Sequence, residues 1–281
     1  MATDTIQPYA QARSFLFAPG NRPAMFEKAA SSGADVVVLD LEDSVPEAEK
    51  AAARDEISRA WPKLAALRAA LMVRMNAPES AAAAQDLEWL DALRPTAIMV
   101  PKAESGAALA SLHLRFDQSA LIPMIESALG YASLREIAAA PGVVRLAVGH
   151  IDFMADTGIQ CDEDQAELAS LRFAVAMATR IHTLAPAVDG VTVQVDDAER
   201  LRRDTLRAVR FGFGGKLCIH PRQVAAVHAA FAPADDEVAW ARRVVAADQV
   251  AGGAAIKIDG KMVDLPVVLQ ARRLLARAER G

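Results

Sequence analysis

Apolar and polar positions follow two alternating patterns along most of this 281-residue chain. Short runs of almost continuous apolar residues are followed by longer segments in which apolar residues recur at helical spacing. Near-continuous apolar runs are typical of strands that are covered on both faces, as in a parallel sheet. Eight runs are predicted as strands: Ser14–Ala18, Asp35–Asp40, Leu71–Asn76, Ala97–Pro101, Ala120–Ile125, Val144–Gly149, Gly190–Val195 and Lys216–Ile219. Segments predicted as helices between them include Pro23–Ser32, Glu47–Trp61, Ala81–Leu93, Ser127–Ala139, Asp164–Leu184 and Ala198–Phe211.

The number of strand–helix units indicates the fold class. Eight units within roughly 230 residues match a TIM (β/α)8 barrel, an α/β fold, in both count and size. A doubly wound open sheet is the alternative, and the strand count favours the barrel. We therefore predict a barrel that forms the catalytic domain over residues 1–232.

After Pro233 the pattern changes, and the barrel needs no further elements. Asp259-Gly260 is a hairpin signal between two short runs of strand-forming residues. The predicted elements are a helix, two strands and a last amphipathic helix: Asp235–Ala247, Ala255–Ile258, Lys261–Val263 and Leu265–Glu279. We predict that residues 233–281 form a C-terminal helix–hairpin–helix extension that serves as a lid and an oligomerisation arm.

Composition and charge narrow the class of protein. The chain is 53% hydrophobic and 24% charged, as in globular proteins, and its net charge of −5 does not suggest a nucleic-acid-binding protein, which needs a basic face. Its two cysteines, Cys161 and Cys218, form neither a disulfide framework nor a zinc-binding pattern. The first residues lack the features of a signal peptide, and no apolar run reaches the length of about 18 residues that a membrane span needs. We expect a cytoplasmic protein that binds neither nucleic acid nor membrane.

Nearly every predicted strand ends in a polar or conformationally special residue. The endings read A-P-G-N-R, L-D-L-E-D, V-R-M-N, V-P-K-A-E-S, M-I-E-S, G-H-I-D and, for the eighth strand, C-I-H-P. In a TIM barrel the active site is assembled at the carboxyl ends of several strands. One acid at a strand end would be unremarkable, but polar endings on nearly every strand indicate that they meet in one pocket.

Two carboxylates, Glu126 and Asp152, follow the fifth and sixth predicted strands and lie 26 positions apart. This is about the length of one strand–helix–strand step, so neighbouring parallel strands would bring both acids to the same end of the sheet. Either acid alone could be an ordinary solvated residue. As a pair they predict a site for Mg²⁺, which prefers oxygen ligands and is often held by one or two carboxylates.

Arg74 ends the third predicted strand, where a buried arginine needs an anionic partner. That partner could be one of the acids at the end of the second strand, namely Asp40, Glu42 and Asp43. It could also be a substrate carboxylate or a developing oxyanion, which the guanidinium fork can bind bidentately, and both interpretations can hold together. Lys102 is either a cation of the same pocket or a solvated strand end, and we favour the pocket.

Other charged motifs carry weaker signals. Arg13 begins the first predicted strand and Arg22 follows the A-P-G-N turn, and both could bind phosphate, although surface arginines are common. His220 precedes Pro221 at the end of the last strand and is interpreted as structural. The string G-F-G-G-K is not a phosphate-binding P-loop, because its lysine begins a strand instead of opening a helix.

The motifs together resemble one known family. The matching strings are R-S-F-L-F-A-P-G-N-R-P, D-V-V-V-L-D-L-E-D-S-V-P-E-A-E-K, V-R-M-N, M-V-P-K-A-E-S, I-P-M-I-E-S, G-F-G-G-K-L-C-I-H-P and D-G-K-M-V-D. They run from Arg13 to Asp264 in the family's order. The chain thus resembles the citrate lyase β-subunit-like branch of the HpcH/HpaI aldolase superfamily.

The resemblance implies a TIM barrel, a homotrimer or a hexamer of trimers, that cleaves or forms a carbon–carbon bond in a 3-hydroxyacyl thioester with Mg²⁺. It implies that Glu126 and Asp152 bind the metal and that Arg74 polarises a carbonyl. Asp264 would be a catalytic acid or base that reaches the site of a neighbouring subunit. The region of Arg13 would lie near coenzyme A.

The sixth-strand motif departs from the family. Relatives often have G-A-E-D, whereas this chain has G-H-I-D, so that His150 and Ile151 replace a small residue and an acid. Asp152 is kept, so the departure bears on the substrate more than on the metal. Versions with a histidine here resemble the branch linked to citramalyl-CoA.

We expect a Mg²⁺-dependent lyase that cleaves citramalyl-CoA, malyl-CoA or citryl-CoA by a retro-Claisen reaction to acetyl-CoA and a 2-keto acid. A thioesterase acting on the same coenzyme A esters is one alternative, and a citrate lyase β subunit acting on a carrier-protein thioester is another. A class II aldolase acting on free hydroxy-keto acids is disfavoured, because the G-K-M-V-D tail suits a lid over a thioester. The sequence leaves the acyl group and its stereochemistry open.

Overall fold

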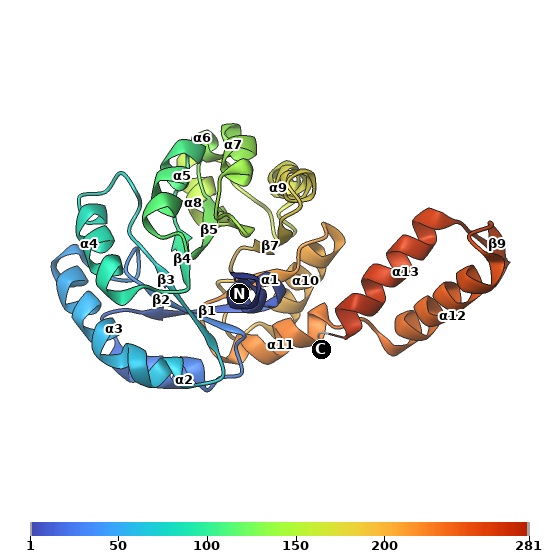
Figure 1. Cartoon of the computed structure of the whole chain (residues 1–281), viewed down its shortest axis with the longest axis horizontal. Coiled ribbons are helices and arrows are strands. Elements are labelled where there is room, and N and C mark those ends of the chain that lie inside the picture. Colours follow the sequence, from blue (N-terminus) through green and yellow to red (C-terminus); the bar gives the residue numbers. More distant parts are fainter. Residues whose placement is uncertain (1, 280–281) are drawn as a thin grey trace. The chain divides into compact units, whose positions relative to one another are not determined.

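Eight parallel strands close into a barrel in the computed structural model of the chain, which describes residues 2–279 (Figure 1). Each strand pairs with the next one along the chain, and β1 pairs with β8 to close the ring. The strands are β1 (Ser14–Pro19), β2 (Val36–Asp40), β3 (Ala70–Arg74), β4 (Ala97–Val100), β5 (Ala120–Ile125), β6 (Arg145–Val148), β7 (Ala185–Asp189) and β8 (Gly215–Cys218). This is the TIM-barrel architecture that the predicted strands indicated.

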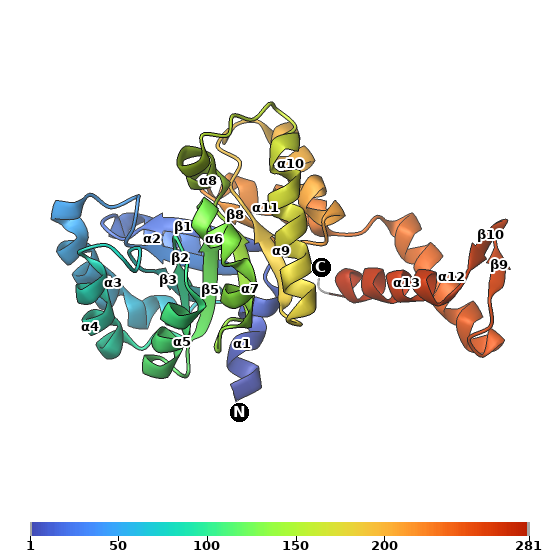
Figure 2. The ribbon, with the colours of Figure 1, turned by 90° about the horizontal axis from the view of Figure 1, so that it is seen from above.

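Helices follow the strands and cover the outside of the barrel (Figure 2). The α-helices up to residue 231 are α1 (Ala2–Gln11), α2 (Phe26–Ala30), α3 (Lys50–Ala65), α4 (Ala83–Leu93), α5 (Gly106–Arg115), α6 (Ala128–Ala132), α7 (Leu134–Ala139), α8 (His150–Thr157), α9 (Ala169–Ile181), α10 (Ala198–Arg210) and α11 (Arg222–Phe231). Three short 3-10 helices are η1 (Pro23–Met25), η2 (Glu47–Glu49) and η3 (Ala166–Leu168). None of the helices within residues 2–279 is long and apolar enough to cross a membrane.

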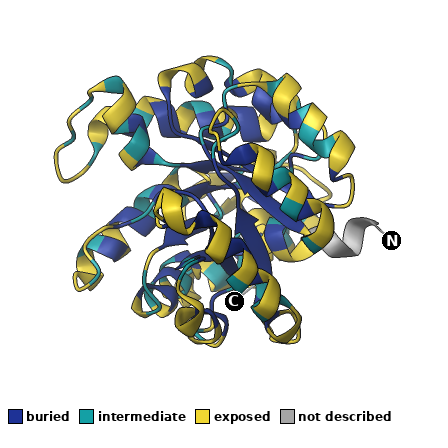
Figure 3. Ribbon diagram, turned by 90° about the vertical axis from the view of Figure 1, so that its left-hand side faces the viewer, coloured by how far each residue is buried: buried dark blue, intermediate teal, exposed yellow. Residues whose placement is uncertain are grey.

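The strands are buried on both faces, which explains their near-continuous apolar sequences. All five residues of β2 and all six of β5 are buried, and Figure 3 shows exposed residues mainly on the helices and loops. Side chains from several strands, among them Phe15, Val36, Met72, Met99 and Ile122, pack into one cluster. The barrel therefore has a filled core, as TIM barrels do, and its chemistry is left to the strand ends.

The amino end of the barrel is closed by α1 and by Arg145, the first residue of β6. The Tyr9 hydroxyl donates a hydrogen bond to the Leu71 carbonyl at 2.7 Å. Nη1 of Arg145 donates to the carbonyls of Tyr9 at 2.9 Å and Ala12 at 2.7 Å, and its guanidinium lies 5.3 Å from the centroid of the Phe15 ring. Arg145 is 1% exposed, so it satisfies buried carbonyls that water cannot reach.

The seventh strand differs from the prediction, which placed it at Gly190–Val195. The structure has β7 at Ala185–Asp189 and leaves residues 190–195 without regular structure. The alternating V-T-V-Q-V pattern there belongs to a partly exposed loop, and the strand is the short run A-P-A-V-D, whose last three residues are buried. Pro186 obscured this strand; it is tolerated because the β6–β7 register shifts between Arg145 and Ala147, and irregular positions accept proline.

The chain divides into two compact units, Met1–Val227 and His228–Gly281, whereas the predicted boundary lay after residue 232. The second unit contains α12 (Asp235–Ala251), β9 (Ile256–Ile258), β10 (Lys261–Val263) and α13 (Leu265–Ala278). The strands β9 and β10 pair antiparallel, and Asp259 and Gly260 both have positive φ, so the hairpin prediction is confirmed. The second unit has a small hydrophobic core, which includes Ala241, Val244 and Val268.

We predict that Arg145→Met lowers the free energy of unfolding by about 2 kcal/mol, because the carbonyls of Tyr9 and Ala12 would lose a buried donor. The measurement is the midpoint of urea unfolding followed by circular dichroism. Arg180→Met on the exposed side of α9 is the matched control and should change stability by less than about 0.5 kcal/mol. Equal midpoints for the two variants would contradict the role given to Arg145.

Candidate active site

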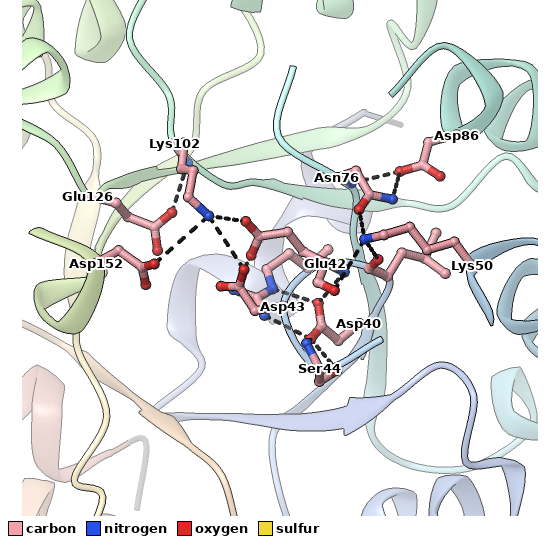
Figure 4. A network of polar contacts seen from close by, with 12 residues as sticks. Asp40, Glu42, Asp43, Ser44, Lys50, Asn76, Asp86, Lys102, Glu126 and Asp152 are labelled. Atoms are coloured by element: carbon pink, nitrogen blue, oxygen red, sulfur yellow. Dashed lines mark hydrogen bonds and ion pairs between the residues drawn. The ribbon is translucent and has the colours of Figure 1, made fainter. Parts of the chain in front are cut away.

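Charged side chains from five neighbouring strand ends meet at the carboxyl end of the barrel, as the sequence predicted (Figure 4). Asp40 and Arg74 are the last residues of β2 and β3, Lys102 follows β4, and Glu126 follows β5 directly. Asp152 differs slightly from its expected place, because it lies in the first turn of α8 instead of directly at a strand end. Strands β5 and β6 are neighbours, so Glu126 and Asp152 still come to the same edge.

Arg74 is held by the acids that follow β2. Its Nε and Nη2 donate to the two carboxylate oxygens of Asp40 at 2.6 and 2.7 Å, and Nη1 lies 2.8 Å from Glu42. Burial alone would raise the pKa of Asp40, but the charge and hydrogen bonds of Arg74 outweigh it and hold that pKa below its usual value. The guanidinium also lies 4.7 Å from the centre of the Phe17 ring. The two hydrogen bonds to Asp40 use Nε–H and one N–H of Nη2, so a well-oriented arginine keeps donors for a ligand.

Lys102 connects the acids of this site. Its Nζ donates to Glu42 and lies 3.6 Å from Asp43 and 3.9 Å from Asp152. Its backbone N–H donates to Glu126 Oε2 at 2.8 Å. Lys102 has a φ of +46°, a left-handed conformation that is costly for a residue with a side chain and is often found at functional sites. The structure thus favours the pocket interpretation of Lys102 over a solvated strand end.

Glu126 is 2% exposed and, within the described residues, forms no ion pair with a cationic side chain. Burial raises the pKa of Glu126 to about 8, and the charges of Glu42 and Asp152 add to this shift, although the Lys102 N–H and Arg74 oppose it. The carboxylate lies against Gly149: a Cβ at that position would come within 2.0 Å of Glu126 Oε1. Only glycine at position 149 leaves room for this acid.

The balance of charge at the site favours a cation. The site contains two cationic side chains, Arg74 and Lys102. The carboxylates that surround them number five: Asp40, Glu42, Asp43, Glu126 and Asp152. Within the described residues there is no group of three or more His, Cys, Asp or Glu side chains that could hold a metal ion by itself. A pair of carboxylates fits Mg²⁺, which keeps water or substrate oxygens as further ligands, better than zinc, which takes three or four protein ligands.

A buried network behind the site holds the ends of β2 and β3 in place. Lys50 Nζ donates to the Leu41 carbonyl at 2.9 Å and also to Asn76 (Figure 4). The backbone and side-chain N–H groups of Asn76 donate to Asp86 at 2.6 and 2.8 Å, and Asp86 pairs with Arg54 at 3.0 Å. The sequence analysis gave none of these residues a role. Lys50 and Asn76 nevertheless lie within the strings D-V-V-V-L-D-L-E-D-S-V-P-E-A-E-K and V-R-M-N, which was the available signal.

A pocket of about 400 Å³ opens beside Lys102, between α4 and α5. Its lining is largely apolar and includes Met75, Val100, Ala103 and Leu112. A mostly apolar pocket with a charged group at its side is a common form of small-molecule site. This pocket therefore offers space for an uncharged part of a ligand whose charged part meets Lys102.

Arg13 does not join the other predicted site residues. It precedes β1 at the amino end of the barrel. There its backbone N–H donates to the Asp35 carboxylate at 2.7 Å, and its side-chain Nε lies 3.6 Å from the same carboxylate. The remaining predicted residues of the barrel lie at the carboxyl ends of the strands, the length of a strand away. Arg13 therefore lies at the opposite end of the barrel from the edge where those residues gather, and its expected place near coenzyme A stays a prediction.

His150 is 3% exposed and packs against Gly190, where a Cβ would come within 2.1 Å of His150 Nδ1. Burial lowers the pKa of His150 to about 4, although the charge of Asp189 opposes the shift. Asp189 ends β7 and pairs with Arg172 at 2.9 Å, with both residues 1% exposed. The sequence analysis missed this ion pair, because it placed the seventh strand after Asp189.

Asp264 belongs to the second unit, His228–Gly281. It is exposed and occupies the N-cap position of α13, but its side chain makes no capping hydrogen bond to that helix. An N-cap aspartate commonly accepts a hydrogen bond from a backbone N–H in the first turn of its helix. Its carboxylate is therefore not used for capping in this structure.

Comparisons with known proteins agree with the geometry. The chain matches the HpcH/HpaI aldolase/citrate lyase family over residues 13–221. It is 39% identical to a citrate lyase subunit beta-like protein of Mycobacterium tuberculosis over 94% of each chain, and 35% identical to the L-malyl-CoA/beta-methylmalyl-CoA lyase of Rhodobacter capsulatus over 97% of each.

The fold is also similar to that of a solved structure. The crystal structure of CitE from M. tuberculosis in complex with magnesium, acetoacetate and coenzyme A superposes with a TM-score of 0.85 and 36% identity, covering 96% of this chain and 99% of that one. Together with the family match over most of the barrel, these similarities show that the chain belongs to the HpcH/HpaI aldolase/citrate lyase family.

Proposed function

We propose that this protein is a Mg²⁺-dependent carbon–carbon lyase that cleaves a 3-hydroxyacyl-CoA thioester by a retro-Claisen reaction to acetyl-CoA and a 2-keto acid. The observation that carries the proposal is the pair Glu126 and Asp152 on neighbouring units of the barrel, beside a buried and well-oriented Arg74. The relatives support it: the CitE complex contains magnesium and coenzyme A, and the R. capsulatus relative is named a malyl-CoA lyase.

Glu126 and Asp152 would hold the metal. Bound Mg²⁺ would act as a Lewis acid and as a template that orients the hydroxyl and carboxylate oxygens of the substrate. Glu126 is suited to this role because its burial and its raised pKa mark a carboxylate that lacks a compensating positive charge. Lys102 would orient Glu126 through its backbone N–H and bind substrate through its ammonium group.

Arg74 would stabilise the negative charge that develops on the thioester oxygen when the carbon–carbon bond breaks. Asp40 and Glu42 fix its guanidinium, so its remaining N–H donors need no reorganisation during the reaction. An oxyanion donor of this kind is worth about 3–4 kcal/mol in the transition state. The resulting enolate carbon then needs a proton.

Asp264 would supply that proton as general acid, a contribution of roughly 10²–10⁴ in rate. We propose that it serves the site of a neighbouring subunit in a homotrimer or a hexamer of trimers. Its exposure supports this role, and so does its uncapped carboxylate next to a hairpin in the second unit. Residues 233–281 would then act as the lid and oligomerisation arm.

The acyl group is proposed from the G-H-I-D motif. His150 is the first residue of α8, two positions before Asp152, and is buried against Gly190. The resemblance of this motif to the citramalyl-CoA branch makes citramalyl-CoA the first substrate to test, before malyl-CoA and citryl-CoA.

We predict that purified protein with Mg²⁺ releases acetyl-CoA and a 2-keto acid from at least one of these three coenzyme A esters, measured by chromatography of the products. Glu126→Gln and Asp152→Asn should each abolish the activity, because both remove a charged oxygen ligand at nearly constant shape. Glu88→Gln, at an exposed acid on α4, is the matched control and should keep full activity.

Release of free coenzyme A instead of acetyl-CoA would replace the lyase with a thioesterase. Turnover only of carrier-protein thioesters would indicate a subunit of a larger complex. Full turnover by Glu126→Gln in excess chelator would contradict the metal site.

We predict that Arg74→Lys lowers kcat by about 10²–10³ although it keeps the positive charge, because an ammonium group cannot bind Asp40 bidentately and donate to an oxyanion at once. The measurements are kcat and KM, with thermal unfolding as the check on folding. A kcat within about twofold of the wild-type value would limit Arg74 to charge balance with the neighbouring acids.

We predict that Asp264→Asn and Arg74→Ala proteins, each inactive alone, regain activity when they are refolded together. Mixed oligomers would contain interfaces that combine an intact Arg74 with an intact Asp264 from another subunit. The measurement is activity across a series of mixing ratios, with mixed oligomers verified by mass spectrometry. If no ratio restores activity, Asp264 does not act on a neighbouring subunit.

A further inference from the structure

Helix α10 has an arginine-rich face that the lyase reaction does not use. Its sequence, A-E-R-L-R-R-D-T-L-R-A-V-R, contains five arginines and two acids. The five arginines line one pocket of about 420 Å³: Arg200, Arg202, Arg203, Arg207 and Arg210. None of them contacts the site of Glu126 and Asp152 in any ion pair or hydrogen bond described for the chain.

Positive charge also exceeds negative charge beneath this face. The side chains of Arg200 and Arg207 are only 14% and 17% exposed, and both contact Asp204, which Arg207 Nη2 approaches to 3.0 Å. Deeper in the barrel, the next carboxylate is Asp189, which pairs with Arg172 and also faces Lys216. Two carboxylates, Asp189 and Asp204, therefore face four buried or half-buried cations: Arg172, Arg200, Arg207 and Lys216.

Hydrogen bonding among these cations and acids is incomplete. Arg172 Nη2 and Arg207 Nη2 donate to one oxygen, Gln165 Oε1, at 2.7 and 2.8 Å. Within the described residues, Arg172 Nη1 and Arg207 Nε have no hydrogen-bond partner although both atoms are buried. Burial lowers the pKa of Arg207, and the positive charge of Arg172 lowers it further. The buried oxygens Asp189 Oδ2 and Asp204 Oδ1 also lack a hydrogen-bond partner within the described residues, so the acids of the cluster do not saturate its guanidinium N–H groups.

The acids at the edge of the pocket do not correct this imbalance. Glu163 lies 4.0 Å from Arg200 and 3.9 Å from Arg203, and its side chain is 83% exposed. Contacts of this length in solvent are weak and are screened by salt. The Asp164 carboxylate accepts a hydrogen bond from the Ala166 N–H, so it serves the loop before η3. The lining of the pocket holds five arginines but only three acids, Glu163, Asp164 and Asp204, so an excess of two positive charges faces the pocket.

We propose that the arginine face of α10 is a binding site for a phosphate group of a small molecule, separate from the carbon–carbon lyase site. A phosphate dianion matches the excess of two charges and presents several oxygens to guanidinium forks, which bind phosphate bidentately. The half-buried Arg200 and Arg207 form the floor of the site, and the exposed Arg203 and Arg210 form its rim. The net charge of −5 for the whole chain disfavours a nucleic acid as the ligand.

The test is calorimetric titration of the full-length protein with inorganic phosphate and with tripolyphosphate, without Mg²⁺ and at constant ionic strength. The double variant Arg203→Gln/Arg210→Gln removes the rim and leaves the buried floor intact. We expect its Kd for the better of the two ligands to rise at least tenfold, because charge-assisted hydrogen bonds are lost. Arg59→Gln on α3, an arginine whose side chain is 67% exposed, is the matched control and should leave Kd unchanged.

Inorganic phosphate and tripolyphosphate distinguish a site for a single phosphate from one for an oligophosphate, and either result supports the proposal. Malonate, a dianion without phosphorus, should bind at least tenfold more weakly. The proposal is overturned if neither phosphate compound binds at 10 mM, if the double variant binds as the wild type does, or if malonate binds equally well. Lyase activity of the double variant is measured in parallel and should equal that of the wild type, so a failure here is separable from a failure of the lyase proposal.

Discussion

The buried bidentate pair between Arg74 and Asp40 is the interaction on which the candidate active site depends. It joins the last residues of two neighbouring strands, β2 and β3, at 2.6 and 2.7 Å. A buried charge of either sign would be costly alone, so each residue requires the other. The pair also fixes the direction of the guanidinium, and this orientation lets the loop after β2 place Glu42 against both Arg74 and Lys102.

Acidic and basic side chains alternate across the barrel mouth from this pair to Glu126. Glu126 accepts a hydrogen bond from the backbone N–H of Lys102 and lies near the charge of Asp152. The site thus ends in a buried carboxyl group whose pKa is raised, because the described protein groups do not compensate its negative form. A barrel built to bind a divalent cation and an anionic substrate together needs this arrangement, since the metal offsets the acids and the free N–H groups of Arg74 remain for the substrate.

The two charged regions of the barrel are opposite in sign. The mouth near β2 to β6 holds more carboxylates than cations, whereas the region of α9, α10 and β8 holds more cations than carboxylates. Both are partly buried, where water and salt screen charge less than at the surface. The same physical argument, that uncompensated buried charge needs a counter-ion, therefore leads to a cation at one region and an anion at the other.

The sequence predicted the barrel because near-continuous apolar runs indicate buried strands, and it predicted the hairpin from Asp259-Gly260. It also predicted most of the residues that gather at the barrel mouth, because the carboxyl ends of neighbouring strands lie side by side. It failed at β7, where Pro186 interrupted the apolar run and a partly exposed loop imitated a strand, and so it missed Asp189. The tertiary structure was needed to show that Arg13 contacts Asp35, that Arg74 is held by Asp40, and that Lys50, Asn76 and Asp86 support them. Such pairings join residues far apart in the chain, and their distances depend on packing that no local pattern encodes.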